Sequence, residues 1–239
     1  MAQSAPQRQE IGRLSPSGLV DSTAQALIDK VRVAVQAYMS QFDASHDYAH
    51  IERVLALALR IQRDEQILRH GWGQPYSTTL ITLSALLHDY GDYKYLQPHE
   101  GDGRDMAYTL LLSHGADPAL AAQVQKIVSH VSYSHEIANS EEVQEVLREL
   151  PELAVVQDAD RLDAIGAVGI GRVFAYGGAK GRSLDESVAH FGIKLERLEG
   201  MMKTETGSRL AKERTRRLRV LREWWEEETG AGDYGERVK

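Results

Sequence analysis

Three short clusters of histidine and aspartate carry the residue types that bind metal ions. The first is His46-Asp47-Tyr48-Ala49-His50, with Arg53 one helical turn later; the second is the doublet His88-Asp89; the third is the run Asp158, Asp160 and Asp163. Imidazole nitrogens and carboxylate oxygens are ligands of divalent transition metals. Each cluster alone also has an ordinary interpretation, as a helix cap, a surface histidine or a hydrogen-bonded core histidine.

The His88-Asp89 doublet is the most unusual of the three, because it ends the almost entirely apolar segment 77–89. A helix with that pattern is expected in the middle of a domain, where an unpaired carboxylate is costly. A divalent ion would neutralise Asp89 and bind the His88 imidazole. The alternative is that Asp89 is exposed at a helix end and His88 is a hydrogen-bonded core residue.

Helical spacing also bears on the other two clusters. His46 and His50 are four residues apart, so on a continuous helix they would face the same way, as metal-binding pairs do. Asp158 and Asp160 are two apart and therefore lie on different helical faces. We expect these two aspartates not to bind one ion together.

The elements that must position these clusters are predicted to be helices. Apolar residues recur at three- and four-residue spacing from about Leu19 onward, and strand-like alternation is scarce. The expected helices cover about 22–38, a segment from 47 to 61, 77–89, 105–114, 118–131, 153–175, a segment from the capping box at 183 to about 198, and 208–228. The sequence therefore predicts one all-α domain, residues 19–228, with flexible tails at 1–18 and 229–239.

Composition excludes several classes of protein. The 239 residues contain no cysteine, which rules out disulfides, thiolate nucleophiles and iron–sulfur clusters. The formal net charge of −7 argues against nucleic acid and anionic membrane as partners. No apolar run is long enough to cross a bilayer, and the first residues lack a secretory signal. We expect a cytoplasmic protein.

The three clusters, in this order and in an all-α chain, resemble the HD-domain metal-dependent phosphohydrolase superfamily. The similarity is carried by HDYAHIERV (46–54), LLHDYGDYK (86–94) and QDADRLDAIGAVGIGRVFAYGG (157–178). The later segment 190–214 is similar to the tail of a bacterial and fungal branch of that superfamily. The resemblance spans roughly residues 40–215 and implies a single HD-domain helical bundle.

The resemblance also implies a ligand set. Its positions fall on His50, His88, Asp89 and Asp160, which would hold one divalent transition metal, Mn²⁺, Fe²⁺, Ni²⁺, Co²⁺ or Zn²⁺. Asp158 and Asp163 are interpreted as supporting or helix-capping groups, and Asp92 as a candidate orienting group or base.

The function that this resemblance implies is hydrolysis of a small phosphorylated substrate, a nucleotide being favoured, by a metal-activated water. Asp89, Arg53 and Lys94 are the predicted catalytic residues. Arg53, Lys94 and Arg161 are close in sequence to the ligands and are candidates to hold phosphate oxygens, although a solvated or salt-bridged cation is an equal alternative for each.

Two other functions remain open. His99 and His130 lie between the doublet and Asp160, and as additional ligands they would make a di-iron oxygenase possible. A non-catalytic nucleotide-binding regulatory module is the third hypothesis. Trp224 and Trp225 are interpreted as packing anchors, and a homodimer is compatible with them.

Overall fold

The described part of the protein is entirely helical outside its turns. The computed structural model describes residues 22–42, 47–68, 76–91, 103 and 105–230, and over these residues it contains eleven α-helices, one 3₁₀ helix and no strand. The helices are α1 (Ser22–Met39), α2 (Tyr48–Leu68), α3 (Thr78–Leu87), α4 (Met106–Ser113), α5 (Pro118–Ser129), α6 (Tyr133–Ala138), α7 (Ser140–Glu149), α8 (Glu152–Asp163), α9 (Gly166–Ala179), α10 (Leu184–Ile193), the 3₁₀ helix η1 (Leu195–Met201) and α11 (Glu205–Thr229). The all-α prediction is confirmed; the predicted tail at 1–18 and all but the start of the tail at 229–239 lie outside the described residues.

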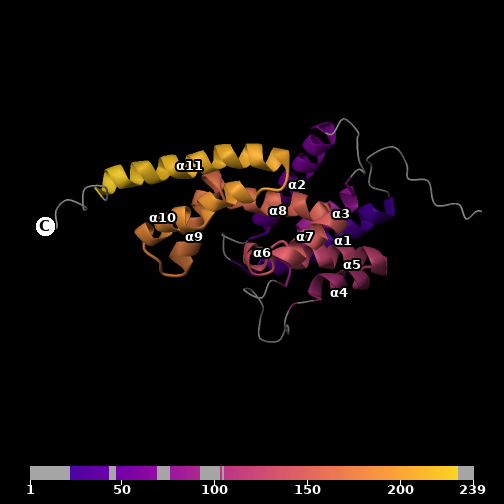
Figure 1. The fold of residues 1–239 in the computed structure, drawn as a ribbon. Coiled ribbons are helices and arrows are strands. Elements are labelled where there is room, and N and C mark those ends of the chain that lie inside the picture. Colours follow the sequence, from indigo (N-terminus) through magenta and orange to yellow (C-terminus); the bar gives the residue numbers. More distant parts are fainter. Residues whose placement is uncertain (1–21, 43–46, 69–75, 92–102, 104, 231–239) are drawn as a thin grey trace, which may run out of the picture.

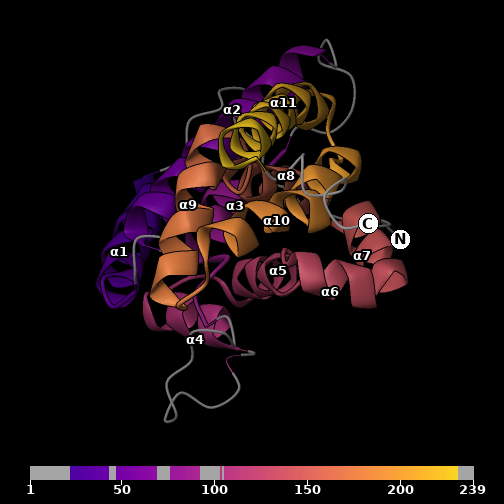
Figure 2. The same cartoon turned by 90° about the vertical axis from the view of Figure 1, so that its left-hand side faces the viewer.

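Helix α3 is the centre of the bundle, as its apolar sequence predicts. Eight of its ten residues are buried, and it packs against α1, α2, α5 and α8 (Figure 2). Ser77 starts the helix, since its hydroxyl accepts a hydrogen bond from the Leu80 backbone N–H at 3.2 Å. A helix surrounded on all sides positions its C-terminal residues, His88 and Asp89, inside the protein.

Helices α2, α3 and α8 pack against one another and bring the three clusters together. Each pair among them is in contact, although α2 and α8 are separated by more than 80 residues of chain (Figure 1). The buried faces of α2 and α8 carry Ile51, Val54, Ala58, Val155, Val156, Ala159 and Leu162. This apolar contact fixes the N-terminal turn of α2 beside the C-terminal turn of α8.

The predicted single helix over 153–175 is wrong in one respect, because the chain breaks into α8 and α9. Gly166 follows the break with φ of +76°, a conformation that glycine adopts without strain. A Cβ on Gly169 would lie 2.2 Å from the Ala164 carbonyl oxygen, so only glycine allows α9 to start this close to the end of α8. The break redirects α9 so that it forms a wall of the cleft described below.

Two other parts of the helix prediction also need correction. No helix is predicted from the sequence between residues 131 and 153, yet this stretch forms the short helices α6 and α7. The helix that starts at the Ser183–Glu186 capping box ends at Ile193, and Leu195 and Leu198 belong to the separate helix η1. The capping box itself is confirmed by hydrogen bonds in both directions.

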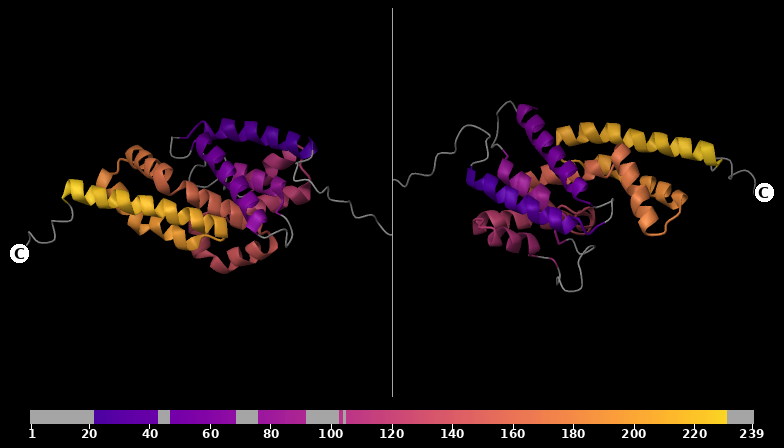
Figure 3. Two further views of the ribbon diagram at one scale, coloured as in Figure 1. Left: turned by 90° about the horizontal axis from the view of Figure 1, so that it is seen from above. Right: turned by 180° about the vertical axis from the view of Figure 1, so that it is seen from behind.

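The long helix α11 lies along α8, α9, α10 and η1, extending away from the α1–α5 end of the molecule (Figure 3). Its N-terminus is anchored by two carboxylates from other helices. Asp158 accepts hydrogen bonds from the Lys203 and Thr204 backbone N–H groups, and Glu65 accepts one from Thr206. Asp158 therefore has a supporting role: from within α8 it holds the residues that start α11, and Thr204 is the N-cap.

Arg161 does not face a phosphate site, which corrects its candidate role. Only 2% of the residue is exposed, and its guanidinium forms an ion pair with Glu136 of α6 and donates to the Met201 carbonyl at 2.9 Å. Lys203 reaches the same carboxylate at 2.7 Å. Burial raises the pKa of Glu136, but these two cations outweigh it and hold the pKa below its usual value. Arg161 ties α8 to α6 and η1.

No helix among the described residues is long and apolar enough to cross a membrane.

Trp225 fulfils the predicted packing role within the chain, since its ring lies 6.0 Å from that of Phe174 and its indole N–H donates to Asp185 at 2.8 Å. Trp224 is 58% exposed.

Candidate metal centre

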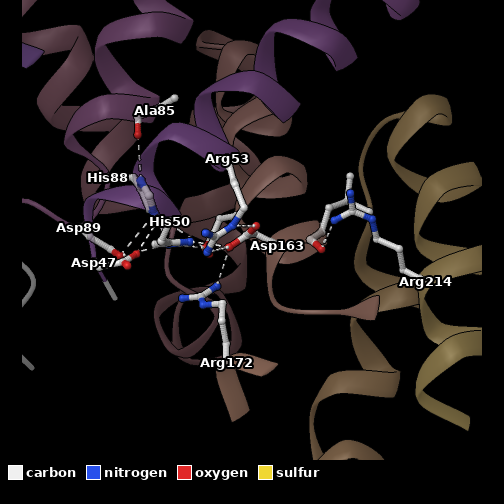
Figure 4. Close-up of polar contacts among 11 residues, drawn as sticks. Asp47, His50, Arg53, Ala85, His88, Asp89, Asp163, Arg172 and Arg214 are labelled. Atoms are coloured by element: carbon white, nitrogen blue, oxygen red, sulfur yellow. Dashed lines mark hydrogen bonds and ion pairs between the residues drawn. The ribbon is translucent and has the colours of Figure 1, made fainter. Parts of the chain in front are cut away.

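The first turn of α2 and the C-terminal end of α3 present two histidines to the same point. Asp47 precedes α2 and accepts a hydrogen bond from the His50 backbone N–H at 3.1 Å, which fixes the turn that carries the His50 side chain. His88 is the C-terminal cap of α3. Figure 4 shows both imidazoles converging beside Asp89.

The four sequence-predicted ligands lie together. The His50 Nε2 atom is 3.2 Å from His88 Nε2, 3.4 Å from Asp89 Oδ2 and 3.6 Å from Asp160 Oδ1. The His88 Nε2 atom is 3.5 Å from Asp89 Oδ2 and 3.8 Å from Asp160 Oδ1. Both histidines are buried, whereas 15% of the Asp89 side chain and 28% of the Asp160 side chain remain exposed.

Hydrogen bonds at Nδ1 fix which nitrogen of each ring faces the cluster. His50 Nδ1 lies 2.8 Å from Asp163 Oδ2, and His88 Nδ1 lies 2.9 Å from the Ala85 carbonyl oxygen. Both partners are acceptors, so each Nδ1 carries the proton and each Nε2 presents a lone pair. Two lone pairs and two carboxylates then face one point, which is favourable only with a positive charge between them.

This donor set fits a divalent transition metal. Ligand bonds of about 2.1 Å place neighbouring donors about 3.0 Å apart in an octahedral site and about 3.4 Å apart in a tetrahedral one. The observed separations of 3.2 to 3.8 Å are close to those values. Burial lowers the pKa of His50, but Asp163 and Asp89 outweigh it and raise the pKa, so the carboxylates around this ring favour a positive charge, either an added proton at Nε2 or a metal ion in its place.

Asp163 is the group that orients His50, in agreement with its predicted supporting role. Its carboxylate accepts from His50 Nδ1, from Arg53 at 2.8 and 3.1 Å, and from Arg172 at 3.1 Å, and only 2% of its side chain is exposed. Burial raises the pKa of Asp163, but the bonds from His50 and Arg53 and the charge of Arg172 hold it well below its usual value. The carboxylate is therefore ionised and fixed.

We expect Asp163→Ala to weaken metal affinity about 10- to 100-fold, the usual effect of losing the group that orients a ligating histidine. His50 would then lose both its orientation and the acceptor for its Nδ1 proton. Isothermal titration of the metal-free protein with Mn²⁺ measures the change. Asp163→Asn keeps one oxygen acceptor and should lose less; equal affinity in all three proteins would show that Asp163 does not position His50.

The cluster opens into a cleft with a volume of about 360 Å³, within the size range of small-molecule sites. His50, His88, Asp89 and Asp160 lie at one place in its lining. The remaining lining comes from the segment 131–134 after α5, from α9, and from α10 and its flanking residues; its polar and aromatic members include Tyr133, Arg172, Tyr176, Arg182, His190 and Lys194.

Of the cations predicted from sequence, Arg53 and Arg161 do not line the cleft. The Arg53 guanidinium donates two hydrogen bonds to Asp163. The geometry therefore favours a positioning role for Arg53 over phosphate contact. Lys94, His46, Asp92 and His99 lie outside the described residues. His130 is absent from the cleft lining and instead lies beside His135 and Glu142.

The sequence analysis missed Arg172, Arg182 and Lys194 as candidate binding residues. Arg172 lies inside the 157–178 segment that carries the resemblance, which was a usable signal. Arg182 and Lys194 flank the capping-box helix and have no local signature; only the reversal of direction between α9 and α10 brings them to the cleft.

Comparisons with known proteins show what the chain as a whole is similar to. Residues 47–165, which include all four candidate ligands, match the HD domain family. The Bacillus subtilis (strain 168) protein YpgQ is 35% identical over 190 residues, which cover 78% of this chain and 85% of YpgQ. A crystal structure of YpgQ in complex with ADP is 33% identical, with a TM-score of 0.66 over 86% of this chain and 96% of that one. An HD-superfamily hydrolase from Bacillus thuringiensis is 29% identical, with a TM-score of 0.54 over 87% of this chain and 99% of the other.

Proposed function

This chain belongs to the HD-domain family, and we propose that it is a metal-dependent phosphohydrolase acting on a small phosphorylated substrate, most simply a nucleotide. The observation that carries the proposal is the convergence of His50, His88, Asp89 and Asp160 at the wall of a cleft that also presents three basic side chains. The bound ion would be Mn²⁺, Fe²⁺, Ni²⁺, Co²⁺ or Zn²⁺. Such an ion lowers the pKa of a bound water and polarises a phosphoryl oxygen.

The charge of the cleft supports an anionic substrate. Arg172, Arg182 and Lys194 line the same cleft as the carboxylates of Asp89 and Asp160. Burial and the nearby positive charges of Lys194 and Arg182 together lower the pKa of His190 in the same lining. Lys194 and Arg182 line the cleft near this ring, where they would offset the charge of a bound phosphate.

Arg172 is suited to a double role. Its guanidinium lies 3.1 Å from Asp163 and borders the cleft, with 13% of the side chain exposed. It therefore helps hold the carboxylate that orients His50 while adding positive charge beside the ligand cluster. An arginine held in this way contributes charge without the cost of ordering a flexible side chain when substrate binds.

Two tyrosines supply the flat surfaces that a nucleobase requires. Tyr133 carries Lys194 over its ring at 4.9 Å, and Tyr176 carries Arg182 at 5.3 Å. Aromatic rings stack on bases regardless of base identity, and cations over the rings place phosphate-binding groups next to them. The structure of its relative YpgQ in complex with ADP supports the proposal that this chain also binds a nucleotide.

We expect Lys194→Ala to lower kcat/KM for a phosphorylated substrate at least about tenfold, corresponding to ~1.4 kcal/mol, with metal content unchanged. The lysine lines the cleft and is not one of the four candidate ligands. Lys180→Ala is the matched control, since Lys180 lies 5.7 Å from the Tyr176 ring centre but does not line the cleft. Equal losses in both variants would show that overall charge, not the cleft, is responsible.

The experiment that tests the reaction is a screen for phosphate and pyrophosphate release from nucleoside mono-, di- and triphosphates and from sugar phosphates, with the metal-loaded full chain. The proposal expects one class of substrate to be hydrolysed. Nucleotide binding without turnover would favour the regulatory-module hypothesis. Oxygen consumption by the iron-loaded protein without phosphate release would favour the oxygenase hypothesis.

A further inference from the structure

A second group of potential metal donors lies at the junction of α5, α6 and α7. His130 caps the C-terminus of α5, His135 lies in α6, and Glu142 lies in the first turn of α7. These short helices follow one another in space as they do in sequence (Figure 2). One donor atom from each of the three residues lies within 4.8 Å of the others.

The side chains are arranged around one point. The rings of His130 and His135 meet edge to face with centres 4.8 Å apart. The Glu142 carboxylate spans them, with Oε1 3.2 Å from His130 Nε2 and Oε2 3.7 Å from His135 Nε2. Two nitrogens and a carboxylate therefore converge from three separate helical elements.

The nitrogens at this point have no hydrogen-bond partner. His130 is only 8% exposed, and its Nδ1 lies 2.6 Å from the Lys126 carbonyl oxygen, so Nδ1 carries the proton and Nε2 presents a lone pair. The Nε2 atoms of both His130 and His135 are buried and make no hydrogen bond. A buried lone pair aimed at a carboxylate is unfavourable unless a proton or a metal ion lies between them.

We propose that His130, His135 and Glu142 form a second metal site, for Zn²⁺ or a divalent ion of similar preference. Two imidazoles and one glutamate are a recurrent zinc ligand set, with a further position open to water. The Lys126 carbonyl orients His130 as the Ala85 carbonyl orients His88. The Glu142 side chain is 56% exposed, which gives an ion a path from solvent.

This site is distinct from the His50–His88–Asp89–Asp160 cluster and does not depend on the proposed phosphohydrolase activity. The two groups share no residue, and His130 does not line the cleft. The four residues that follow His130, Val131 to Ser134, do line it. An ion bound to His130 and His135 would therefore fix both ends of a segment that forms one cleft wall.

The test measures metal binding in the Asp89→Ala variant, in which the His50–His88–Asp89–Asp160 cluster has lost a ligand. Metal-free Asp89→Ala protein is titrated with Co²⁺, whose visible absorption reports nitrogen and carboxylate coordination. We expect about one equivalent to bind. Adding Glu142→Gln or His135→Gln should lower the affinity at least about tenfold, whereas adding Glu141→Gln, an exposed neighbour with the same charge, should not. Circular dichroism checks that each variant retains its helical content.

The melting temperature gives a second measure of metal binding that does not depend on cobalt absorption. Zn²⁺ should raise the melting temperature of Asp89→Ala protein, because a ligand that binds only the folded state stabilises it. The rise should disappear with Glu142→Gln and persist with Glu141→Gln. The proposal is overturned if Asp89→Ala protein binds no cobalt, or if Glu142→Gln and Glu141→Gln bind it equally.

Discussion

Asp89→Ala protein is expected to lose the metal bound between His50 and His88 and at least about a thousandfold in turnover, ~4 kcal/mol of transition-state stabilisation. Asp89 provides a donor atom within 3.5 Å of both Nε2 atoms and one of the two negative charges in the cluster. Its removal leaves two neutral imidazoles and Asp160 alone to bind a divalent ion. Elemental analysis and kinetics on the same preparation measure both losses.

The comparison with Asp163→Ala makes this prediction specific. Asp163 is more deeply buried than Asp89 but faces the Nδ1 side of His50, away from the donor cluster. Its removal should weaken metal binding without abolishing it, so that turnover recovers when metal is added in excess. If excess metal restores Asp89→Ala protein to the same extent, Asp89 is not a ligand.

Glu136→Ala is expected to lower the free energy of unfolding by about 3–5 kcal/mol, the usual cost of removing one partner from a buried ion pair. The variant would leave the Arg161 guanidinium with 2% exposure and without its carboxylate. Lys203, which bonds the same carboxylate, would also lose a partner. Urea unfolding in buffer with a chelator measures the change without a contribution from bound metal.

A double variant separates charge burial from packing. Glu136→Leu combined with Arg161→Met removes both charges and keeps apolar volume, so it should restore much of the stability lost in Glu136→Ala. Glu145→Ala, on the exposed face of α7, serves as the surface control and should change stability by less than about 0.5 kcal/mol. A Glu136→Ala loss no larger than this control would show that the buried pair does not stabilise the fold.

The candidate metal cluster was predictable because its proposed ligands lie in motifs with local signatures. The apolar segment 77–89 predicts a central helix, and such a helix carries His88 and Asp89 into the interior. Asp160 and Asp163 are three residues apart, so they share a face of α8, and that face meets the N-terminal turn of α2. The spacing puts both aspartates beside His50, and the resemblance to the family assigns Asp160 as the ligand.

The position of Arg161 illustrates what local reasoning could not supply. Adjacent helical residues point about 100° apart, so the Arg161 side chain faces different neighbours from those of Asp160. In α8 that direction leads to Glu136 and Met201, which are 25 and 40 residues away in sequence. Only the tertiary packing of α6 and η1 decides that this arginine is structural.

The cleft cations were hidden for a related reason. Arg182 and Lys194 lie 22 and 34 residues after Asp160, beyond a helix break and a further turn. The break depends on Gly166, with its positive φ, and on Gly169, where a Cβ would clash with Ala164. Helices α6 and α7 are too short to be predicted from helix propensity, because tertiary packing stabilises such short helices more than propensity does.

The central claim is that the His50, His88, Asp89 and Asp160 cluster holds an ion required for phosphate ester or anhydride hydrolysis. The most direct measurement strips the full chain of metal and then titrates Mn²⁺ while following phosphate and pyrophosphate release from the best substrate of the screen. The account predicts that activity falls to background on stripping and returns in proportion to metal added to wild-type protein, but not to Asp89→Ala protein. Full hydrolysis by the stripped protein, or equal recovery in Asp89→Ala protein, would contradict it.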